Sequence, residues 1–432
     1  MRFDVAIIGA GTAGAGAAWQ CARRGLRVVC LDARPLAEAG ARWVNGVARW
    51  LLDAAEIPPP TGDELRGDDG PFHLIAGWGP ERVTMHERGV LELDMRRLVA
   101  RLQAMAADAG AELRGDVRVL GLDGDRLDTS EGPLHAEWIV DASGLAGARL
   151  IDMPTVDRQH LCAAAQAVHA VTDLEAARAY FERHEVPEGE SLCFTGIAGG
   201  YSILNLRLEG DELSVLTGSI PADGHPSGRA LLDRFVAEQP WIGAEQFGGA
   251  RAIPIRRPFD RLVHGRVALL GDAGCQVFSA HGSGIGIGLL AGRMLAEALA
   301  RGRGPADYQR RFLREQGGVL AAYDIFRRHS QQLRAEDLAT LMRAGLLDAA
   351  SATAGASQRL PELDPAMARA KLEALTRAPK HALALAAVGA RMAAVAGLYL
   401  GYPDDRERLP LWSRAVARLV GDRQPDITGI SD

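Results

Sequence analysis

Two glycine-rich runs have the residue types and spacing to hold a dinucleotide and to place polar groups beside it. The first run, GAGTAG, contains Gly9, Gly11 and Gly14 and follows an apolar segment over residues 3–8. Gly9 permits a tight turn, Gly11 lets the backbone approach a pyrophosphate, and Gly14 allows helix and strand to pack closely. The pyrophosphate is expected at the N-terminus of the following helix, where unpaired N–H groups favour an anion.

A second apolar run, residues 27–31, ends at Asp32. An acid at this place accepts a hydrogen bond from a ribose 2′-hydroxyl, which favours FAD or NAD over a nucleotide with a 2′-phosphate. Strand, glycine turn, helix, second strand and acid together predict a dinucleotide-binding unit. The residues expected to bind the cofactor here are Gly9, Gly11, Thr12, Ala13, Gly14, Asp32, Ala33 and Arg34.

The second run, GDAGCQVFSAHGSGIGIG over residues 271–288, follows a predicted strand at 266–270 and precedes an apolar helix at 289–299. Its glycines permit close contact with a flat ring, and the helix dipole stabilises negative charge there by about 0.3–1 kcal/mol. A reduced flavin is anionic at its pyrimidine end, so this element suits it. His281 is the candidate catalytic group beside the ring, with a packing role as the alternative. Cys275 is a candidate reactive thiol.

A third acidic residue, Asp141, ends a predicted strand at 138–140 and is followed by Gly144. In open α/β sheets such a position faces the cofactor crevice. The chain shows no second strand–GxGxxG–helix–strand–acid unit for a separate nicotinamide domain.

The spacing of apolar residues predicts an α/β fold in four parts. A Rossmann-like FAD-binding domain takes residues 1–150 and 251–300, and a mainly antiparallel substrate domain is inserted at 151–250. Alternating runs at 201–207 and 212–217 predict a hairpin in that insert. Residues 301–432 are expected to be helical.

Composition narrows the classes of function. The 432 residues are 47% hydrophobic and 24% charged, with a net charge of −6, so no electrostatic footprint for nucleic acid or an anionic membrane is expected. Five scattered cysteines without CxxC spacing indicate a reducing, cytoplasmic compartment and neither a disulfide framework nor a metal site. The apolar segment 381–400 is interrupted by Arg391, which favours a buried or interfacial helix over a transmembrane one.

These elements together resemble the flavoproteins that include aromatic hydroxylases of the para-hydroxybenzoate hydroxylase type, geranylgeranyl reductases and tryptophan halogenases. GAGTAG with Asp32 resembles the ADP-binding turn, VDASGLAGAR at 140–149 the second motif, and residues 271–288 the third. The resemblance implies that Asp272 binds the FAD ribityl chain and that Gly282 and Gly284 lie against the flavin. Gly271 and Ile285 belong to the same motif, and Arg96 or Arg97 falls where the family places an arginine near the FAD phosphates.

The flavoproteins that this chain resembles catalyse three kinds of reaction: halogenation, reduction of isoprenoid double bonds and hydroxylation. A halogenase needs an N-terminal lysine and a WxWxIP motif, but this chain has no lysine before Lys371 and no such motif. An isoprenoid reductase is expected to show a YxWxFP-like motif and a greasy tunnel; the motif is absent, so reduction is the alternative. Cys275 and the HGSGIG segment make the third motif most similar to the flavoproteins of tryptophylquinone biogenesis.

The main expectation is therefore an FAD-dependent monooxygenase that uses oxygen and NADH or NADPH. Its expected substrate is an aromatic small molecule or a tryptophan side chain in a partner polypeptide. A flavin-binding scaffold without turnover is a further alternative.

Overall fold

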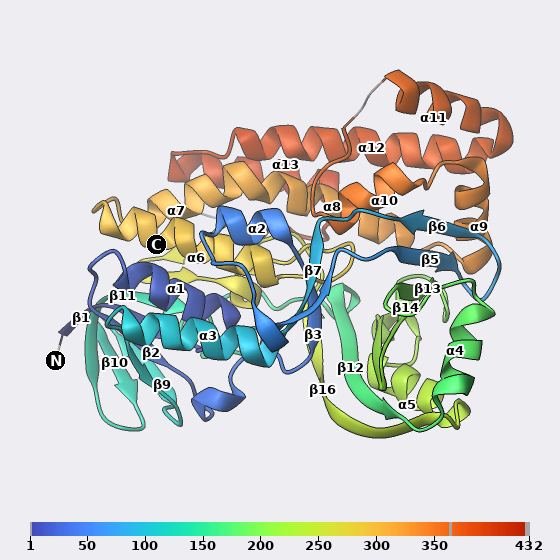
Figure 1. Cartoon of the computed structure of the whole chain (residues 1–432). Coiled ribbons are helices and arrows are strands. Elements are labelled where there is room, and N and C mark those ends of the chain that lie inside the picture. The colour runs from blue at the N-terminus through green and yellow to red at the C-terminus, as the bar shows by residue number, and fades with distance from the viewer. Residues whose placement is uncertain (1, 363–364, 428–432) are drawn as a thin grey trace.

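The computed structural model describes residues 2–362 and 365–427. A parallel sheet with its helices forms one half of the molecule, an antiparallel sheet forms the other half, and C-terminal helices extend across both (Figure 1). The predicted α/β fold, with a Rossmann-like FAD-binding part, an antiparallel sheet domain and C-terminal helices, is confirmed.

The parallel sheet is built around the first strand of the chain. β1 (Arg2–Ile8) is buried along most of its length and pairs with parallel strands on both sides. The order is β8 (Glu112–Arg114), β2 (Val28–Leu31), β1, β11 (Leu134–Asp141) and β18 (Val267–Leu269), and β9 (Val119–Asp123), β10 (Arg126–Thr129) and β17 (Val263–His264) extend it. Because parallel strands end at one edge, the loops after β1, β2, β11 and β18 gather there.

The second sheet has seven strands. Its order is β16 (Ile242–Pro254), β12 (Leu161–Val171), β15 (Glu212–Ser219), β14 (Ser202–Glu209), β13 (Ser191–Thr195), β5 (Phe72–Ala76) and β6 (Arg82–Met85). The β14–β15 pair is the hairpin that alternation predicted. The last two strands of this order, β5 and β6, come from residues 1–150, the segment predicted to form the first part of the FAD-binding domain. β5 joins through a parallel pairing with β13, a long-range contact that no local pattern reveals.

A small sheet of β3 (Val44–Ala48), β7 (Val90–Asp94) and β4 (Leu65–Asp68) lies between these two sheets. Gln166 of β12 joins it to the large sheet. The Gln166 Oε1 atom accepts from the Val44 N–H at 2.6 Å, and its Nε2 donates to the Ser214 Oγ at 3.0 Å. The position of β3 is therefore fixed relative to the antiparallel sheet.

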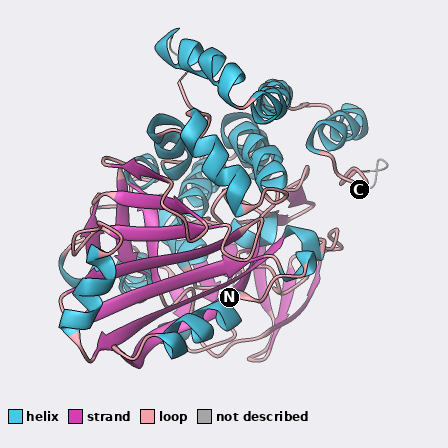
Figure 2. Cartoon of the chain, turned by 90° about the vertical axis from the view of Figure 1, so that its right-hand side faces the viewer, coloured by secondary structure: helices cyan, strands magenta, loops and turns pink. Residues whose placement is uncertain are grey.

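The C-terminal helices form a layer above the strands (Figure 2). They are α7 (Pro305–Phe312), α8 (Gly318–Ser330), α9 (Ala335–Ala344), α10 (Ala349–Ala356), α11 (Pro365–Arg377), α12 (Pro379–Leu400) and α13 (Leu409–Val420). Within the described ranges α12 is the one helix long and apolar enough to cross a membrane by length and composition. One side of α12 packs closely on the start of α8, where Gly317 and Gly318 contact Tyr399.

Buried ion pairs attach the end of the chain to the rest of the protein. The Arg257 guanidinium is fully buried and pairs with the carboxylates of Asp260, Asp422 and Asp426. Arg256 Nη2 lies 2.8 Å from both carboxylate oxygens of Asp426. Because breaking a buried pair leaves an uncompensated charge at a cost of about 3–5 kcal/mol, this cluster fixes the C-terminal segment.

His160 lies in a neighbouring cluster, where its Nδ1 accepts a hydrogen bond from Arg327 Nη2 at 3.1 Å. Burial and the nearby Arg328 guanidinium lower the pKa of His160 to about 4. A depressed histidine pKa contributes stability that is complete above pH ~6.5 and lost as the pH falls toward 4. We expect the Tm of the native protein minus that of His160→Asn to decline between pH 7.5 and pH 5 in scanning fluorimetry. A difference that is constant or grows would contradict this assignment.

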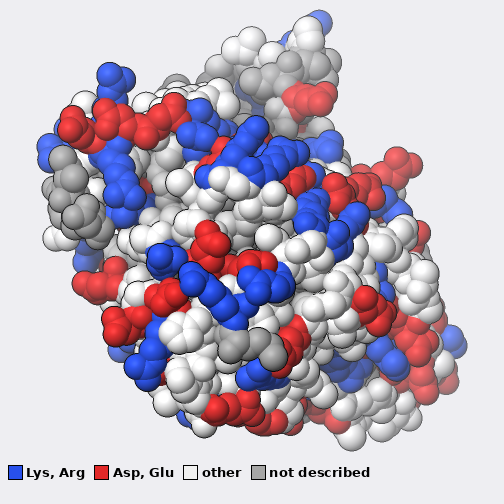
Figure 3. Space-filling view, turned by 90° about the vertical axis from the view of Figure 1, so that its left-hand side faces the viewer, with Lys and Arg blue, Asp and Glu red and all other residues white. Residues whose placement is uncertain are grey.

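Charges of both signs are mixed on the face at the left of Figure 1, without a field of one sign (Figure 3).

Candidate functional site

The turn between β1 and α1 (Thr12–Ala22) is shaped for a close backbone approach. Gly9 has φ +102°, and a Cβ on it would lie 2.5 Å from the Ala142 carbonyl oxygen. A Cβ on Gly14 would lie 1.8 Å from the Gly9 carbonyl oxygen, and one on Gly11 would lie 3.1 Å from the Gly40 Cα. Only glycine fits at Gly9 and Gly14, and the first N–H groups of α1 have no partner within the helix. This cradle fits a pyrophosphate.

Asp32 follows β2 and lies directly beside that turn. Its Oδ2 accepts from the Ala10 N–H at 2.9 Å, and its Oδ1 accepts from the Arg34 N–H at 3.0 Å. The side chain is buried, and Arg34 Nε is 3.6 Å from the same Oδ1. Ala33 connects the two. The predicted ribose acceptor is therefore held in place by the backbone of the turn that it is expected to serve.

Sequence reasoning missed Gln103 of α3 (Met95–Asp108). Its Nε2 donates to the carbonyl oxygens of Ala10 and Leu36, both at 3.0 Å, and so supports the turn from outside. The signal was present, because Gln103 stands four residues after Val99 and interrupts the apolar face of that helix.

The two arginines predicted to lie near the FAD phosphates differ in their exposure to solvent. Arg96 pairs with Asp94 at 2.5 Å, and its guanidinium lies over the Phe247 ring at 3.4 Å. Arg97 is exposed and reaches Asp63 at 3.4 Å. Arg251 of β16, which no pattern singled out, donates to the Gly40 carbonyl beside the turn and interacts electrostatically with Asp32 and Asp272. Arg251 joins Arg96 and Arg97 as a candidate phosphate ligand.

The second glycine run packs directly on the first. A Cβ on Gly271 or on Gly288 would lie 3.1 or 3.2 Å from the Ala13 Cβ, and one on Gly292 would contact Ala17 at 3.2 Å. Because these contacts advance along both helices together, α1 and α6 (Ile285–Ala300) run parallel. Their N-termini, at Thr12 and Ile285, therefore face the same end of the molecule, as a dinucleotide with a flavin requires.

Asp272 lies in the 3-10 turn Gly271–Gly274 between β18 and α6. Its Oδ1 is 3.4 Å from the place that a Gly284 Cβ would take, so the carboxylate is beside the α6 N-terminus. Burial raises the pKa of Asp272, and Arg251 opposes that effect. An acceptor at this place fits the ribityl role that the resemblance implies.

We expect Asp272→Ala to weaken FAD binding by about tenfold, since one hydrogen bond to a charged acceptor contributes roughly 1.5–3 kcal/mol. Fluorescence titration of the deflavinated protein with FAD measures the change. Asp233→Ala, at an exposed ion pair with Arg229, is the matched control. Equal FAD affinity in Asp272→Ala and the control would refute the ribityl role.

Asp141 organises the loop after β11. Its Oδ1 accepts from the Ser143 N–H at 3.1 Å and from the Ser143 hydroxyl, which itself accepts from the Ala148 N–H at 2.8 Å. Burial raises the pKa of Asp141, and Gly144 has φ +86°. The Ala142 carbonyl of this loop forms the floor under Gly9. Contact of Asp141 and Gly144 with the cofactor stays a prediction.

The catalytic role suggested for Cys275 does not fit the structure. Its side chain is fully buried, and burial raises the pKa of the thiol to about 12. The residue has φ +53° at the end of the 3-10 turn. A buried thiol that stays protonated cannot serve as a nucleophile, so the structure does not support a catalytic role for Cys275.

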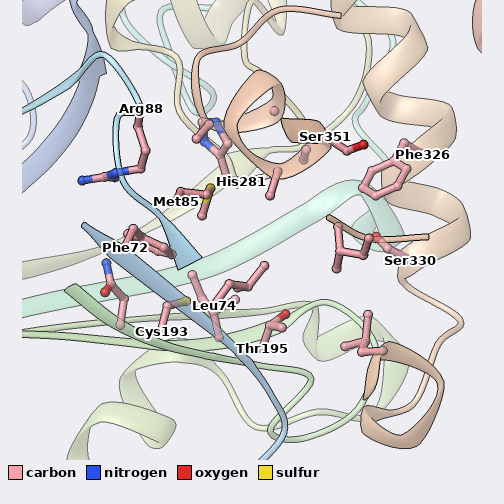
Figure 4. A pocket seen from close by; sticks show the side chains of 18 of the residues that line it. Phe72, Leu74, Met85, Arg88, Cys193, Thr195, His281, Phe326, Ser330 and Ser351 are labelled. Atoms are coloured by element: carbon pink, nitrogen blue, oxygen red, sulfur yellow. The ribbon is translucent and has the colours of Figure 1, made fainter. Parts of the chain in front are cut away.

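His281 faces a cavity (Figure 4). Its ring lies 4.8 Å from that of Phe278, and the cavity leaves it accessible although protein surrounds it. Burial lowers the pKa of His281 to about 4, so the imidazole is neutral at physiological pH. Phe278 and Ser283 pair across the intervening turn, and Gly282 has φ +73°. The neutral His281 ring is thus available to hydrogen-bond a ligand in the cavity, and its catalytic role stays a prediction.

The cavity has a volume of about 960 Å³ and extends from the second glycine run to the C-terminal helices. Near the run it is lined by Gly46 and Ser283, which are joined by a 3.3 Å hydrogen bond from the serine hydroxyl to the glycine carbonyl. β5, β13 and β14 form its floor. Its far walls are the apolar side chains of α8–α12, among them Phe326, Leu338, Leu341, Leu375, Leu385 and Met392.

Comparisons with known proteins agree with this arrangement. The family model of FAD dependent oxidoreductases matches residues 4–63, which hold the first glycine turn and Asp32. A digeranylgeranylglycerophospholipid reductase of Sulfolobus acidocaldarius is 25% identical over 97% of this chain and 98% of its own. Such a reductase of Methanopyrus kandleri, number 2, is 28% identical over 73% of this chain and 81% of its own.

Solved structures show the same fold. A geranylgeranyl bacteriochlorophyll reductase-like protein of Thermoplasma acidophilum has a TM-score of 0.70 at 16% identity and covers 90% of this chain and 99% of its own. The halogenase PltM has a TM-score of 0.62 at 18% identity and covers 97% of this chain and 96% of its own. The N-terminal match supports an FAD-dependent oxidoreductase, and the chain shares the fold of these reductase-like and halogenase structures.

Proposed function

We propose that this protein is an FAD-dependent reductase of carbon–carbon double bonds in a long isoprenoid chain. The observation that carries the proposal is the apolar cavity, which starts at the second glycine run and continues beneath α8–α12. A largely apolar cavity of this kind supports such a reductase, although the YxWxFP-like motif is absent. The relatives that align over 73–97% of this chain are named digeranylgeranylglycerophospholipid reductases, so they favour this alternative over hydroxylation.

FAD, when bound and reduced, would supply a hydride, and a proton would complete the saturation of the double bond. The chain contributes binding and shielding. The N-terminus of α1 would hold the pyrophosphate, and that of α6 would lie beside the flavin. Gly46 and Ser283 line the cavity next to the second glycine run, and the apolar walls keep an alkene chain away from water. The neutral His281 imidazole offers a hydrogen bond without introducing a charge.

The test is a single turnover of FAD-loaded protein that has been reduced anaerobically with dithionite. Because dithionite reduces the flavin directly, the result does not depend on whether the protein uses NADH or NADPH. With geranylgeraniol we expect product masses that rise by two for each double bond reduced. The same protein is then tested in air with NADPH and with tryptophan-containing peptides. A gain of one oxygen atom there, with geranylgeraniol unchanged anaerobically, would overturn the reductase in favour of a monooxygenase.

A further inference from the structure

The last three helices expose large apolar side chains. Leu372 of α11, Leu383 and Leu400 of α12, and Leu411 of α13 are 64, 65, 72 and 72% exposed. Single exposed leucines are ordinary, but four on adjoining helices form a patch, and such patches mark interaction surfaces. α11 and α13 both pack against α12, so the leucines belong to one region of the surface.

The outward side of α12 carries no charge. Leu383, Ala386, Ala390, Ala393, Gly397 and Leu400 follow one another at spacings of three and four, and all six are exposed. The single charged residue within the apolar stretch, Arg391, turns away and donates to the carbonyl oxygens of Leu419 and Val420 at 2.7–3.2 Å. An uncharged surface therefore runs for roughly 25 Å along the helix. The opposite side of α12 packs on α8, which leaves α12 lying along the surface.

The charge around this patch has the opposite sign to that of the whole protein. Residues 365–420 hold nine Lys and Arg against four Asp and Glu, a net charge of +5 in a chain whose net charge is −6. Both lysines of the chain are among them. Arg369 and Lys380 stand three residues before Leu372 and Leu383, and Arg414 and Arg418 follow Leu411 on the same side of α13; all four are exposed.

The combination of exposed leucines and positive charge distinguishes between two candidate partners of this surface, a second copy of the chain and an anionic bilayer. Two copies of a surface with net charge +5 repel each other, whereas anionic lipid headgroups attract it while the leucines enter the acyl region. The cavity also reaches this surface, since Leu372, Ala386 and Gly389 are exposed and line the cavity as well. A long apolar molecule can pass between bilayer and cavity at α11 and α12.

We propose that the surface formed by α11, α12 and α13 docks on an anionic lipid bilayer and that the apolar substrate enters the cavity between α11 and α12. The docking stands on this surface alone, while the route of the substrate rests on the proposed isoprenoid reductase function.

The docking is tested by flotation of the FAD-loaded full chain with vesicles of phosphatidylcholine alone and with 30% phosphatidylglycerol. We expect at least tenfold more bound protein on the anionic vesicles and release by 0.5 M salt. The triple variant Leu383→Gln/Leu400→Gln/Leu411→Gln is expected to lose at least 90% of this binding. Leu120→Gln, at a 69% exposed leucine of β9 in the FAD-binding part, is the matched control and is expected to float normally.

A second variant, Lys380→Glu/Arg414→Glu/Arg418→Glu, tests the charge and is also expected to remain in the unbound fraction. FAD content and Tm of every variant are compared with the native protein. Absence of native protein from the floated fraction would overturn the proposal, as would equal loss in Leu120→Gln. Light scattering that shows a native dimer and a monomeric triple variant would also overturn it, by assigning the surface to a second copy.

Activity separates the two proposals. Native protein and the triple variant, which leaves the cavity lining intact, are compared on geraniol in solution and on geranylgeraniol in anionic vesicles. We expect equal rates on geraniol and at least a tenfold lower rate for the variant on the vesicle substrate. Equal rates on both substrates would overturn the membrane route and leave the reductase in place. Normal flotation without reduction of either substrate would overturn the reductase and leave the docking in place.

Discussion

Replacing Gly14 with alanine is expected to leave the protein with less than a tenth of its normal FAD content. The new Cβ would lie 1.8 Å from the Gly9 carbonyl oxygen, a distance that backbone atoms cannot accept. The turn would have to open, which moves the first N–H groups of α1 away from the pyrophosphate. The 450 nm absorbance of purified protein, per mole of chain, measures the result.

Gly121→Ala is the control for this substitution. Gly121 lies in β9 of the same half of the molecule, its φ is not positive, and a Cβ there meets nothing within 4 Å. We expect full FAD content in Gly121→Ala. A Gly14→Ala protein that retains FAD at the native level would show that the dinucleotide does not lie on this turn.

Thr195→Trp is expected to block the cavity while leaving the flavin site intact. Thr195 ends β13 and faces the cavity (Figure 4). An indole at this position fills part of the cavity and displaces an isoprenoid chain from its reacting position, and misplacement by about 1 Å costs on the order of a hundredfold in rate. We therefore expect about a hundredfold slower reduction of geranylgeraniol at unchanged FAD content, with a smaller loss for geraniol.

Leu120→Trp, on the exposed surface of β9, is the matched control and should reduce geranylgeraniol at the native rate. Native rates in Thr195→Trp, with its FAD and Tm unchanged, would place the reacting substrate outside this cavity.

The sequence predicted the FAD-binding half well because its signals are local. The apolar run of β1, the glycine turn and Asp32 lie within 32 residues, and each has a separate steric or hydrogen-bonding reason. The parallel packing of α1 and α6 was not predicted, although it brings Gly271 and Gly288 onto Ala13. It depends on contacts between segments some 270 residues apart, which no periodicity encodes.

The substrate side was harder to predict, again for a physical reason. The cavity takes its walls from β5, β13, β14 and five C-terminal helices, so its apolar character is spread over short segments that each look ordinary. The strands on this side alternate in character. Leu204 and Leu208 of β14 enter the core of the antiparallel sheet domain, whereas Ile203, Asn205 and Arg207 line the cavity, so neither the apolar nor the polar residues of the strand reveal the cavity by themselves. The net charge is an average of the same kind, since the −6 of the whole chain does not reveal the +5 carried by residues 365–420.

The ion pairs that hold the end of the chain have a consequence for biosynthesis. Arg256 and Arg257 are completed by Asp422 and Asp426, about 165 residues later and within the last eleven of the chain. Domains fold from the N-terminus as they leave the ribosome, so the FAD-binding turn forms early. Arg257 has Asp260 beside it from the start, but the ion pairs of the two arginines with Asp422 and Asp426 form only after those residues have been synthesised. A nascent chain is thus ready to take up FAD well before the helices above the cavity are locked, and a premature stop before Asp422 leaves those helices unsecured.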